Sequence, residues 1–209
     1  MKKYIFGTKG FSKEVEFIIF QNFGILQEVI FVAEDNSEDL GTKINGREVI
    51  SESEFLNNSE EVECYIAVGN PKIKRKIYNK LAHKTNIFFP NLVHKTVVLD
   101  TRYVSFGFGN IICSHASLTT NIKLGNFVHI NLNSTIGHDT VIEDFVTISP
   151  GVNISGNVLL QELSYLGTNC AIIEKRTIGK DVVVGASAVI VKDLLEAGTY
   201  VGMPAKKIK

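Results

Sequence analysis

The sequence lacks an excess of charge, a long apolar run and a set of closely spaced cysteines, and each absence excludes a class of protein. Its 209 residues include 22 basic and 22 acidic side chains, so the formal net charge is zero at pH 7. No block of like charge supplies the basic face that nucleic acids and anionic membranes require, and neither is expected as a partner. No apolar run approaches the roughly 20 residues of a membrane span, and the run at residues 4–6 is too short for a secretion signal.

Cysteine is scarce, and its three occurrences, Cys64, Cys113 and Cys170, lie far apart with no C-x-x-C pair. We therefore expect buried free thiols in a reducing compartment rather than a disulfide framework. No group of histidines and cysteines has the spacing of a zinc site, so no metal is expected. Together these shortages predict a cytoplasmic protein.

Residues 1–85 alternate between short apolar segments and segments with helical spacing. The predicted elements are strands at 4–6, 29–33 and 64–68 and helices at 13–22 and after Pro71. Strand–helix–strand order with short glycine turns is typical of a small parallel sheet covered by helices. The sequence therefore predicts an α/β, Rossmann-like domain over residues 1–90.

From about residue 106 a repeat of six residues replaces this alternation. Every sixth residue is aliphatic, and neither a helix (period 3.6) nor an isolated strand (period 2) produces that spacing. We call these positions the aliphatic ladder. They are Ile112, Leu118, Leu124, Ile130, Ile136, Ile142, Ile148, Ile154, Leu160, Leu166, Ile172, Ile178, Val184 and Ile190.

The period of six predicts a parallel β-solenoid over residues 91–209. Each hexad forms one short strand and a corner, with the ladder residue pointing inward. The residue after it is often small, as at Gly125 and Gly137, and we expect it to let the backbone turn tightly. Three hexads make a triangular coil, so residues n and n+18 become neighbours at the strand spacing of about 4.8 Å.

This stacking places His138 beside Gly156, with Asp139 directly after the histidine. An imidazole can act as a base near neutral pH, and a carboxylate can fix its tautomer. A glycine permits close approach to the main chain, whose N–H could stabilise an oxyanion. The alternative is a solvated corner histidine next to a solvated aspartate.

The other histidines carry less information. We expect His83 to be exposed, His94 to be structural, and His115 and His129 to lie at corners without a carboxylate partner.

The hexad run resembles the hexapeptide-repeat acyltransferases. Residues 131–156, together with 67–70, 91–95 and 201–206, resemble a narrower group that acetylates nucleotide-linked amino sugars, such as the bacillosamine-pathway enzymes, and the related sialic acid O-acetyltransferases. This resemblance implies a left-handed parallel β-helix with acetyl-CoA as co-substrate. It also implies a homotrimer with active sites between neighbouring solenoids.

The resemblance assigns roles to residues of the solenoid. It makes His138 the general base and Asp139 the residue that raises its basicity, and it places Asn131 near the acceptor group. The positions matching acetyl-CoA contacts are Thr147, Gly156, Thr168 and Ala186. At Thr147 the bacillosamine-pathway relatives have a histidine.

The turn from Gly7 to Ser12 lies between a predicted strand and a helix, where phosphates can approach helix N–H groups. It is not a G-x-G-x-x-G motif, so a nicotinamide cofactor is a weak hypothesis. The resemblance implies sugar-nucleotide contacts at Lys9, Gly10, Phe11, Glu34, Asp35 and Gly69. Relatives often have histidine in place of Phe11. Without the resemblance, these glycines would only indicate a tight turn.

The first functional hypothesis is N-acetylation of a nucleotide-linked aminodeoxy sugar, of the UDP-, dTDP- or GDP-4-amino-4,6-dideoxyhexose type, for bacterial surface glycans. The alternatives are O-acetylation of a sugar such as a sialic acid, and a solenoid that only binds, without catalysis. Apolar residues expected to face outward give weak support to the trimer. They are Val128, Val146, Val158 and Val182.

Overall fold

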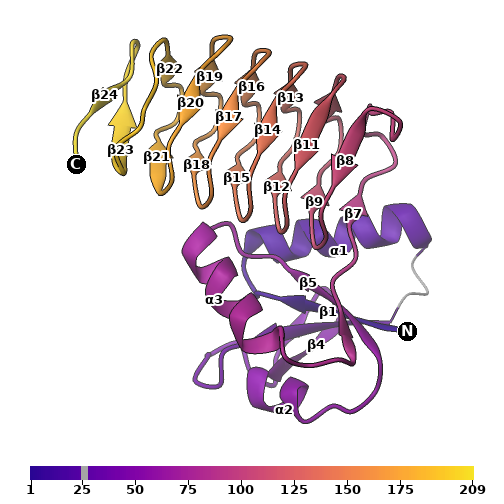
Figure 1. Ribbon diagram of the computed structural model, residues 1–209. Helices are drawn as coiled ribbons and strands as arrows, with labels where there is room; N and C mark the ends of the chain where they lie inside the picture. Colours follow the sequence, from indigo (N-terminus) through magenta and orange to yellow (C-terminus); the bar gives the residue numbers. More distant parts are fainter. Residues whose placement is uncertain (25–27) are drawn as a thin grey trace.

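A six-stranded sheet forms the N-terminal part of the computed structural model, which describes residues 1–24 and 28–209 (Figure 1). In sheet order the strands are β3 (Lys43–Ile44), β4 (Arg47–Ser51), β2 (Val29–Ala33), β1 (Lys2–Phe6), β5 (Val62–Ile66) and β6 (Ile87–Phe88). All neighbours are parallel except β3 and β4. The chain moves outward from β1 through β2 to β4 and then returns beside β1 as β5. The order therefore reverses between β1 and β5, which is where open parallel sheets bind ligands.

Three helices accompany the sheet: α1 (Gly10–Phe23), α2 (Glu52–Leu56) and α3 (Pro71–Leu81). The side chain of Asn70 accepts hydrogen bonds from the backbone N–H groups of Lys72 and Ile73, and Pro71 fills the first helical position, so α3 has a well-defined start. The predicted parallel sheet is confirmed. Its third strand begins two residues earlier than expected, and the sequence had not indicated β3, β4, α2 or β6.

The solenoid has three faces. The first face holds β10 (Ser117–Leu118), β13 (Thr135–Ile136), β16 (Asn153–Ile154), β19 (Ala171–Ile172) and β22 (Val189–Ile190). The second holds β8 (Val104–Phe106), β11 (Ile122–Leu124), β14 (Val141–Ile142), β17 (Leu159–Leu160) and β20 (Thr177–Ile178). The third holds β7 (Leu92–Val93), β9 (Ile111–Ile112), β12 (His129–Ile130), β15 (Thr147–Ile148), β18 (Tyr165–Leu166), β21 (Val182–Val184), β23 (Gly198–Val201) and β24 (Lys206–Lys207).

The aliphatic ladder fills the interior of this prism, as predicted. Ile136 pairs with Ile154, and Ile154 with Ile172, so residues eighteen apart are neighbours. Every ladder residue is buried. The prediction of outward-facing valines is wrong, because a second inward position lies two residues before the ladder residue. Those buried valines are Val128, Val146, Val158 and Val182.

The corners are made by residues in the left-handed backbone region, three positions after each ladder residue. Every sixth residue from 109 to 187 has φ between 54° and 69°. The small residue after the ladder position therefore does not make the turn, which corrects the expectation. It provides clearance between coils, since a Cβ on Gly137 would lie 2.6 Å from the backbone nitrogen of Gly156.

Three columns of left-handed residues define three corners, each named after one residue. The His138 corner, between the first and second faces, contains Asn121, Asp139, Asn157 and Lys175. The Phe145 corner, between the second and third faces, contains Gly109, Phe127, Phe145, Leu163 and Asp181. The Asn169 corner, between the third and first faces, contains His115, Asn133, Gly151, Asn169 and Ser187.

The α/β part packs beneath the Phe145 corner and the third face, with α1 between the sheet and the solenoid (Figure 1). Phe127, Phe145 and Leu163 share one apolar cluster with residues of the sheet, and Leu92 and Ile111 share another with α1. The three cysteines are buried free thiols, as expected. No helix outside residues 25–27 is long and apolar enough to cross a bilayer.

Candidate functional site

His138 and Asp139 form a hydrogen-bonded pair at the exposed corner between the first and second faces. The Nδ1 atom of His138 lies 2.7 Å from Oδ2 of Asp139, and Asn121 donates to the other carboxylate oxygen at 3.1 Å. Because an ionised carboxylate only accepts, Nδ1 carries the proton and Nε2 is left as the acceptor in the neutral ring. The hydrogen bonds from His138 and Asn121 lower the pKa of Asp139. The two adjacent side chains therefore contact each other.

The imidazole of His138 lies directly over Gly156 of the next coil. A Cβ added to this glycine would be 2.5 Å from both Nε2 and Cε1, so any other residue would displace the ring. The backbone carbonyl of His138 accepts from the N–H of Asn157 at 2.8 Å, which fixes the register. The N–H of Gly156 has no hydrogen-bond partner among the described residues. The predicted juxtaposition of imidazole and bare main chain is confirmed.

An exposed strip continues from His138 along the same corner. Glu174 and Lys192 follow at intervals of eighteen residues, so the strip extends over three coil spacings, about 14 Å. Beside it, Ile173 and Val191 are exposed apolar side chains. A cavity of about 170 Å³ ends the strip and is lined by Ile190, Val191, Lys192, Leu194, Pro204, Ala205 and Lys206. The strip therefore contains the carboxylate of Glu174, has apolar side chains beside it, and ends at the cations Lys192 and Lys206.

Two of the predicted acetyl-CoA positions, Thr168 and Ala186, lie at the Asn169 corner and are exposed. Asn131, predicted to contact the acceptor, begins the same corner, and its side chain accepts from the N–H of Leu132 at 2.7 Å. Within one chain the structure does not bring these three residues together with His138.

Thr147 lies in the contact between the two parts of the chain. Its hydroxyl and the carbonyl of Val146 accept hydrogen bonds from Nζ of Lys74, at 3.1 and 3.3 Å. Lys74 is fully buried, and burial holds its pKa well below the usual value. Thr147 is thus on the opposite side of the coil from the His138 corner.

His129 is buried on β12 and not at a corner, which corrects the expectation. Its ring packs on Phe11 of α1 with 5.2 Å between centroids, and within the part of the chain that the structure describes no group meets either ring nitrogen with hydrogen-bond geometry. Burial, with a smaller contribution from the charge of Lys74, holds the pKa of His129 well below the usual value. Of the other histidines, His83 and His115 are exposed, and His94 is buried with Nδ1 2.8 Å from the Thr96 hydroxyl.

A second candidate site lies at the carboxyl ends of β1, β2 and β5. This pocket has a volume of about 390 Å³. Two of the residues predicted to contact the nucleotide, Lys9 and Glu34, line it. Gly10 and Gly69 follow the lining residues Lys9 and Val68 in sequence and have open space where a side chain would be. The lining residues are Phe6, Gly7, Thr8, Lys9, Val32, Ala33, Glu34, Asn36, Ser37, Glu52, Val68, Ile73, Lys76, Ile77 and Lys80.

Two predicted contacts are turned away from this pocket. The carboxylate of Asp35 accepts from the N–H and the hydroxyl of Ser53, at 2.8 and 2.6 Å, and so holds the start of α2. Phe11 packs on His129 of the solenoid. The sequence had not indicated the wall provided by α3, although Ile73, Lys76, Ile77 and Lys80 have the i, i+3, i+4, i+7 spacing of one helix face.

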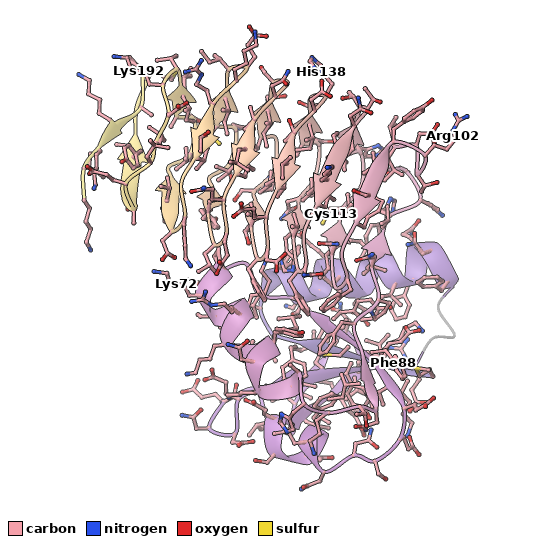
Figure 2. All side chains as sticks on the ribbon, in the orientation of Figure 1. Lys72, Phe88, Arg102, Cys113, His138 and Lys192 are labelled. Atoms are coloured by element: carbon pink, nitrogen blue, oxygen red, sulfur yellow. The ribbon has the colours of Figure 1, made fainter. Side chains whose placement is uncertain are left out.

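The pocket and the His138 corner lie at opposite edges of the molecule. His138 is at the edge of the solenoid farthest from the α/β part, which contains the pocket (Figure 2). In residues 1–24 and 28–209 no group of three histidine, cysteine or carboxylate side chains is arranged to hold a metal ion.

Comparisons with known proteins agree with this architecture. Residues 2–81 match the PglD N-terminal domain family. GDP-perosamine N-acetyltransferase of Escherichia coli O157:H7 is 30% identical over 151 residues, which are 70% of this chain and 65% of that enzyme. The chain thus matches slightly less than two thirds of that relative's length.

Several solved structures match nearly the whole chain, and two of them are at least 30% identical with TM-scores of 0.90. The acetyltransferase domain of PglB from Neisseria gonorrhoeae, in complex with acetyl coenzyme A, has a TM-score of 0.90 and 31% identity, over 99% of this chain and 98% of that one. WeeI from Acinetobacter baumannii has a TM-score of 0.90 and 31% identity, over 99% of both chains. The predicted fold, an α/β domain followed by a left-handed parallel β-helix, is confirmed.

Proposed function

The chain belongs to the sugar N-acetyltransferases of the hexapeptide-repeat group, and we propose that it transfers the acetyl group of acetyl-CoA to the amino group of a nucleotide-linked aminodeoxy sugar. The observation that carries the proposal is the imidazole of His138, held by Asp139 at 2.7 Å and lying over the bare main chain of Gly156. Acyl transfer to an amine is assisted by a base that takes the amine proton and by an N–H group that is free to stabilise the oxyanion.

His138 takes a proton from the attacking amine through Nε2, and Asp139 stabilises the imidazolium that forms. The amine nitrogen forms a bond to the thioester carbonyl carbon, and the N–H of Gly156 stabilises the oxyanion. The carbon–sulfur bond then breaks. The CoA thiolate leaves and is protonated by the imidazolium, which restores the neutral base.

Acetyl-CoA lies along the strip above His138 in this proposal. Ile173 and Val191 offer apolar surface to the pantetheine arm, and Lys192 and Lys206 offer charge to the phosphates at its far end. The strip is about 14 Å long, which suits an extended chain. Because Thr168 and Ala186 lie elsewhere on the coil, they would contact acetyl-CoA bound to a neighbouring chain, and Asn131 would meet the acceptor there. Thr147 is buried against Lys74 and does not support an acetyl-CoA contact.

The nucleotide occupies the pocket at the ends of β1, β2 and β5. Lys9, Gly10, Glu34 and Gly69 remain the proposed contacts, with Lys76 of α3 added. Phe11 and Asp35 shape the pocket indirectly, through His129 and α2. We keep residues 1–90 and 91–209 as the nucleotide-binding and acetyl-transferring domains.

A homotrimer would complete the active site. The pocket and His138 are at opposite edges of one chain, so an acceptor bound in one pocket has to reach the His138 of another chain (Figure 2). Val128, Val146, Val158 and Val182 are buried and therefore give no support to a trimer. The support comes instead from the separation between the pocket and His138. Mixing a His138→Ala chain with a chain disabled in the pocket should restore activity. A molecular mass equal to that of one chain, measured by light scattering, would contradict the trimer. The cytoplasmic location also stays a prediction.

The proposed activity is tested by incubating the protein with acetyl-CoA and UDP-, dTDP- and GDP-linked 4-amino-4,6-dideoxyhexoses, with products analysed by mass spectrometry. The expected product gains one acetyl group on nitrogen. Acetylation of only hydroxyl groups would favour the O-acetyltransferase alternative. A protein that CoA does not stabilise in thermal unfolding would be a binding scaffold instead.

A further inference from the structure

Helix α3 presents two functional faces. Ile73, Lys76, Ile77 and Lys80 form its pocket face, which is one wall of the nucleotide pocket. Lys72, Lys74, Arg75 and Tyr78 form its docking face, which contacts the solenoid. A single rigid helix therefore connects the pocket to the solenoid.

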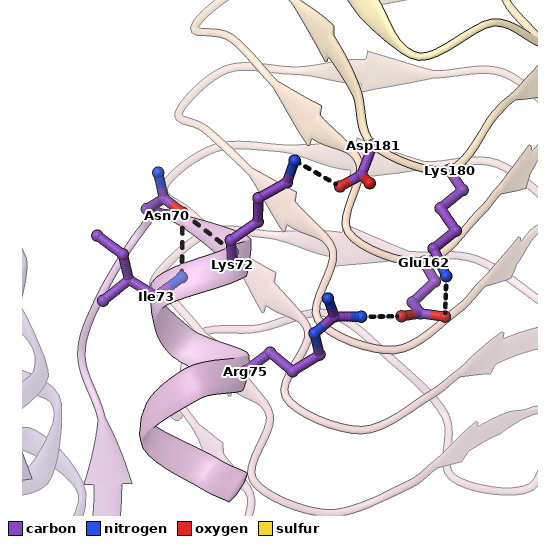
Figure 3. A network of polar contacts seen from close by, with 7 residues as sticks. All are labelled: Asn70, Lys72, Ile73, Arg75, Glu162, Lys180 and Asp181. Atoms are coloured by element: carbon purple, nitrogen blue, oxygen red, sulfur yellow. Dashed lines mark hydrogen bonds and ion pairs between the residues drawn. The ribbon is translucent and has the colours of Figure 1, made fainter.

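Ion pairs fix the N-terminal end of α3 to the solenoid (Figure 3). Nη1 of Arg75 lies 2.6 Å from Oε1 of Glu162, and Nζ of Lys72 lies 3.2 Å from Oδ1 of Asp181. Lys180 contacts the second oxygen of Glu162 at 3.3 Å and holds that carboxylate in place. Glu162 and Asp181 belong to neighbouring coils, so α3 forms ion pairs with two successive coils of the solenoid.

Further contacts join α3 to lower coils. Nζ of Lys74 donates to Thr147, and the ring of Tyr78 lies 4.5 Å from Phe127 and 5.9 Å from Phe145, centroid to centroid. Read from its C-terminal to its N-terminal end, the docking face thus contacts successive coils of the Phe145 corner.

The Phe145 corner differs in composition from the other two. Phe127, Phe145 and Leu163 occupy left-handed positions, with φ of 54°, 60° and 64°, which bulky residues rarely adopt. The equivalent positions elsewhere hold mostly asparagine, aspartate and other polar residues. Strained residues persist where the surrounding structure requires them. Here Phe127, Phe145 and Leu163 form the apolar surface on which α3 packs, which we call the seat of α3.

We infer that α3 is a positioning element: its seat on the Phe145 corner fixes the nucleotide pocket relative to the solenoid, so that an anchored acceptor amine meets the acetyl group. Arg75 and Glu162 are positioning residues in this inference, which rests on the proposed function. The nucleotide is remote from the reacting nitrogen. Its binding energy can accelerate the reaction only if the pocket is held rigidly on its own solenoid, which in the proposed trimer sets the position of the pocket relative to the acetyl-binding corner of the neighbouring chain.

The test uses Arg75→Met, which keeps most of the apolar stem and removes the charge. We expect kcat with the nucleotide sugar to fall roughly ten- to hundredfold, since small misplacements of an anchored substrate have effects of that size. Dissociation constants for the free nucleoside diphosphate and for CoA should stay unchanged. The conservative variant Arg75→Lys, which keeps the charge beside Glu162, should recover most of kcat. Lys2→Met is the matched control, because Lys2 pairs with Glu60 within the α/β part.

A reduced melting temperature with wild-type kcat in Arg75→Met would overturn the inference, because the ion pair would then be only structural. If Arg75→Met does not fold, Phe145→Asn removes part of the seat with a residue suited to the left-handed position, and the same fall in kcat is expected. Unchanged kcat in that variant would also overturn it. Absence of transfer by the wild-type protein to any nucleotide sugar would instead overturn the proposed function itself.

Discussion

The His138 corner and the Phe145 corner have the same backbone and opposite surroundings. Asp139 and Phe145 are both left-handed, with φ of 59° and 60°. At the first corner the column is polar and the imidazole is exposed, and the N–H of the buried Gly156 beneath it has no hydrogen-bond partner among the described residues. At the second the column is apolar and covered by α3. A repeated coil therefore supplies identical scaffolds, and the side chains decide which corner binds ligand and which binds another domain.

The two corners also differ in how the strain of their left-handed residues is offset. A non-glycine residue at a left-handed position costs about 1–2 kcal/mol unless its side chain is suited to it, as asparagine and aspartate are. Full burial of a phenylalanine side chain contributes about 1.5–3 kcal/mol. The covered corner can offset its strain through burial, and an open corner has no such compensation.

Filling the open corner should have the largest effect. In Gly156→Ala the added methyl group would occupy the position of the imidazole, because a Cβ there lies 2.5 Å from Nε2 of His138. We expect kcat to fall on the order of a hundredfold or more, as for loss of a general base, because the displaced imidazole could no longer reach the amine. The measurement is steady-state kinetics, with Ser155→Ala, at the exposed neighbouring position, as control. Full activity in Gly156→Ala would show that the ring and this main chain do not act together.

Making the covered corner polar should reduce stability. Phe127 is fully buried and contacts Tyr78 and Phe145. In Phe127→Asn the lost packing outweighs the relief of strain, and we expect the free energy of unfolding to fall by about 3 kcal/mol. Urea unfolding measures the change. An unchanged midpoint would mean that the aromatic seat does not hold the two parts together.

The reverse exchange, Asn157→Phe, should have a smaller effect. Asn157 is exposed and left-handed with φ of 57°. A phenylalanine there would bear the strain without gaining burial, so a loss of about 1 kcal/mol is expected. The same urea titration applies. A gain in stability would contradict the idea that each corner's residues match its surroundings.

Acid should lower the free energy of unfolding through His129, which is buried between the solenoid and α1. The pKa of buried His129 is held below its usual value, so the unfolded chain takes up a proton below about pH 6.5 while the folded chain does not. The free energy of unfolding should then fall as pH decreases, by up to about 1.4 kcal/mol per pH unit. His129→Leu should lack this contribution to the slope. Lys74 and His94 are present in both proteins, so their effects cancel. Parallel pH profiles would contradict the assignment.

The spacing of the sequence was sufficient to predict that His138 and Gly156 are neighbours at the open corner, whereas their proposed roles came from the resemblance. A period of six fixes the coil, and a coil of eighteen residues places Gly156 beside His138 without further information. The prediction overlooked a second inward position, although the sequence contains its signal. Val128 and Val146 lie two residues before a ladder residue, and residues two apart on a strand point to the same face. The interior of the prism accordingly takes two side chains from most hexads.

The covered corner could not be predicted from local pattern alone. Phe127, Phe145 and Leu163 are eighteen residues apart, and this apolar column was a usable signal of a docked domain. Which domain covers it depends on contacts between residues far apart in sequence, such as Arg75 with Glu162. For the same reason His129 was expected at a corner, although it lies buried beneath α1.

The most direct test of the account is the kcat of His138→Ala measured beside that of His115→Ala, an exposed histidine at another corner. We predict that kcat of His138→Ala falls by about two to four orders of magnitude with acetyl-CoA affinity nearly unchanged, as for loss of a general base, and that His115→Ala behaves as wild type. Equal kcat in the two variants would remove the imidazole from the reaction and contradict the account.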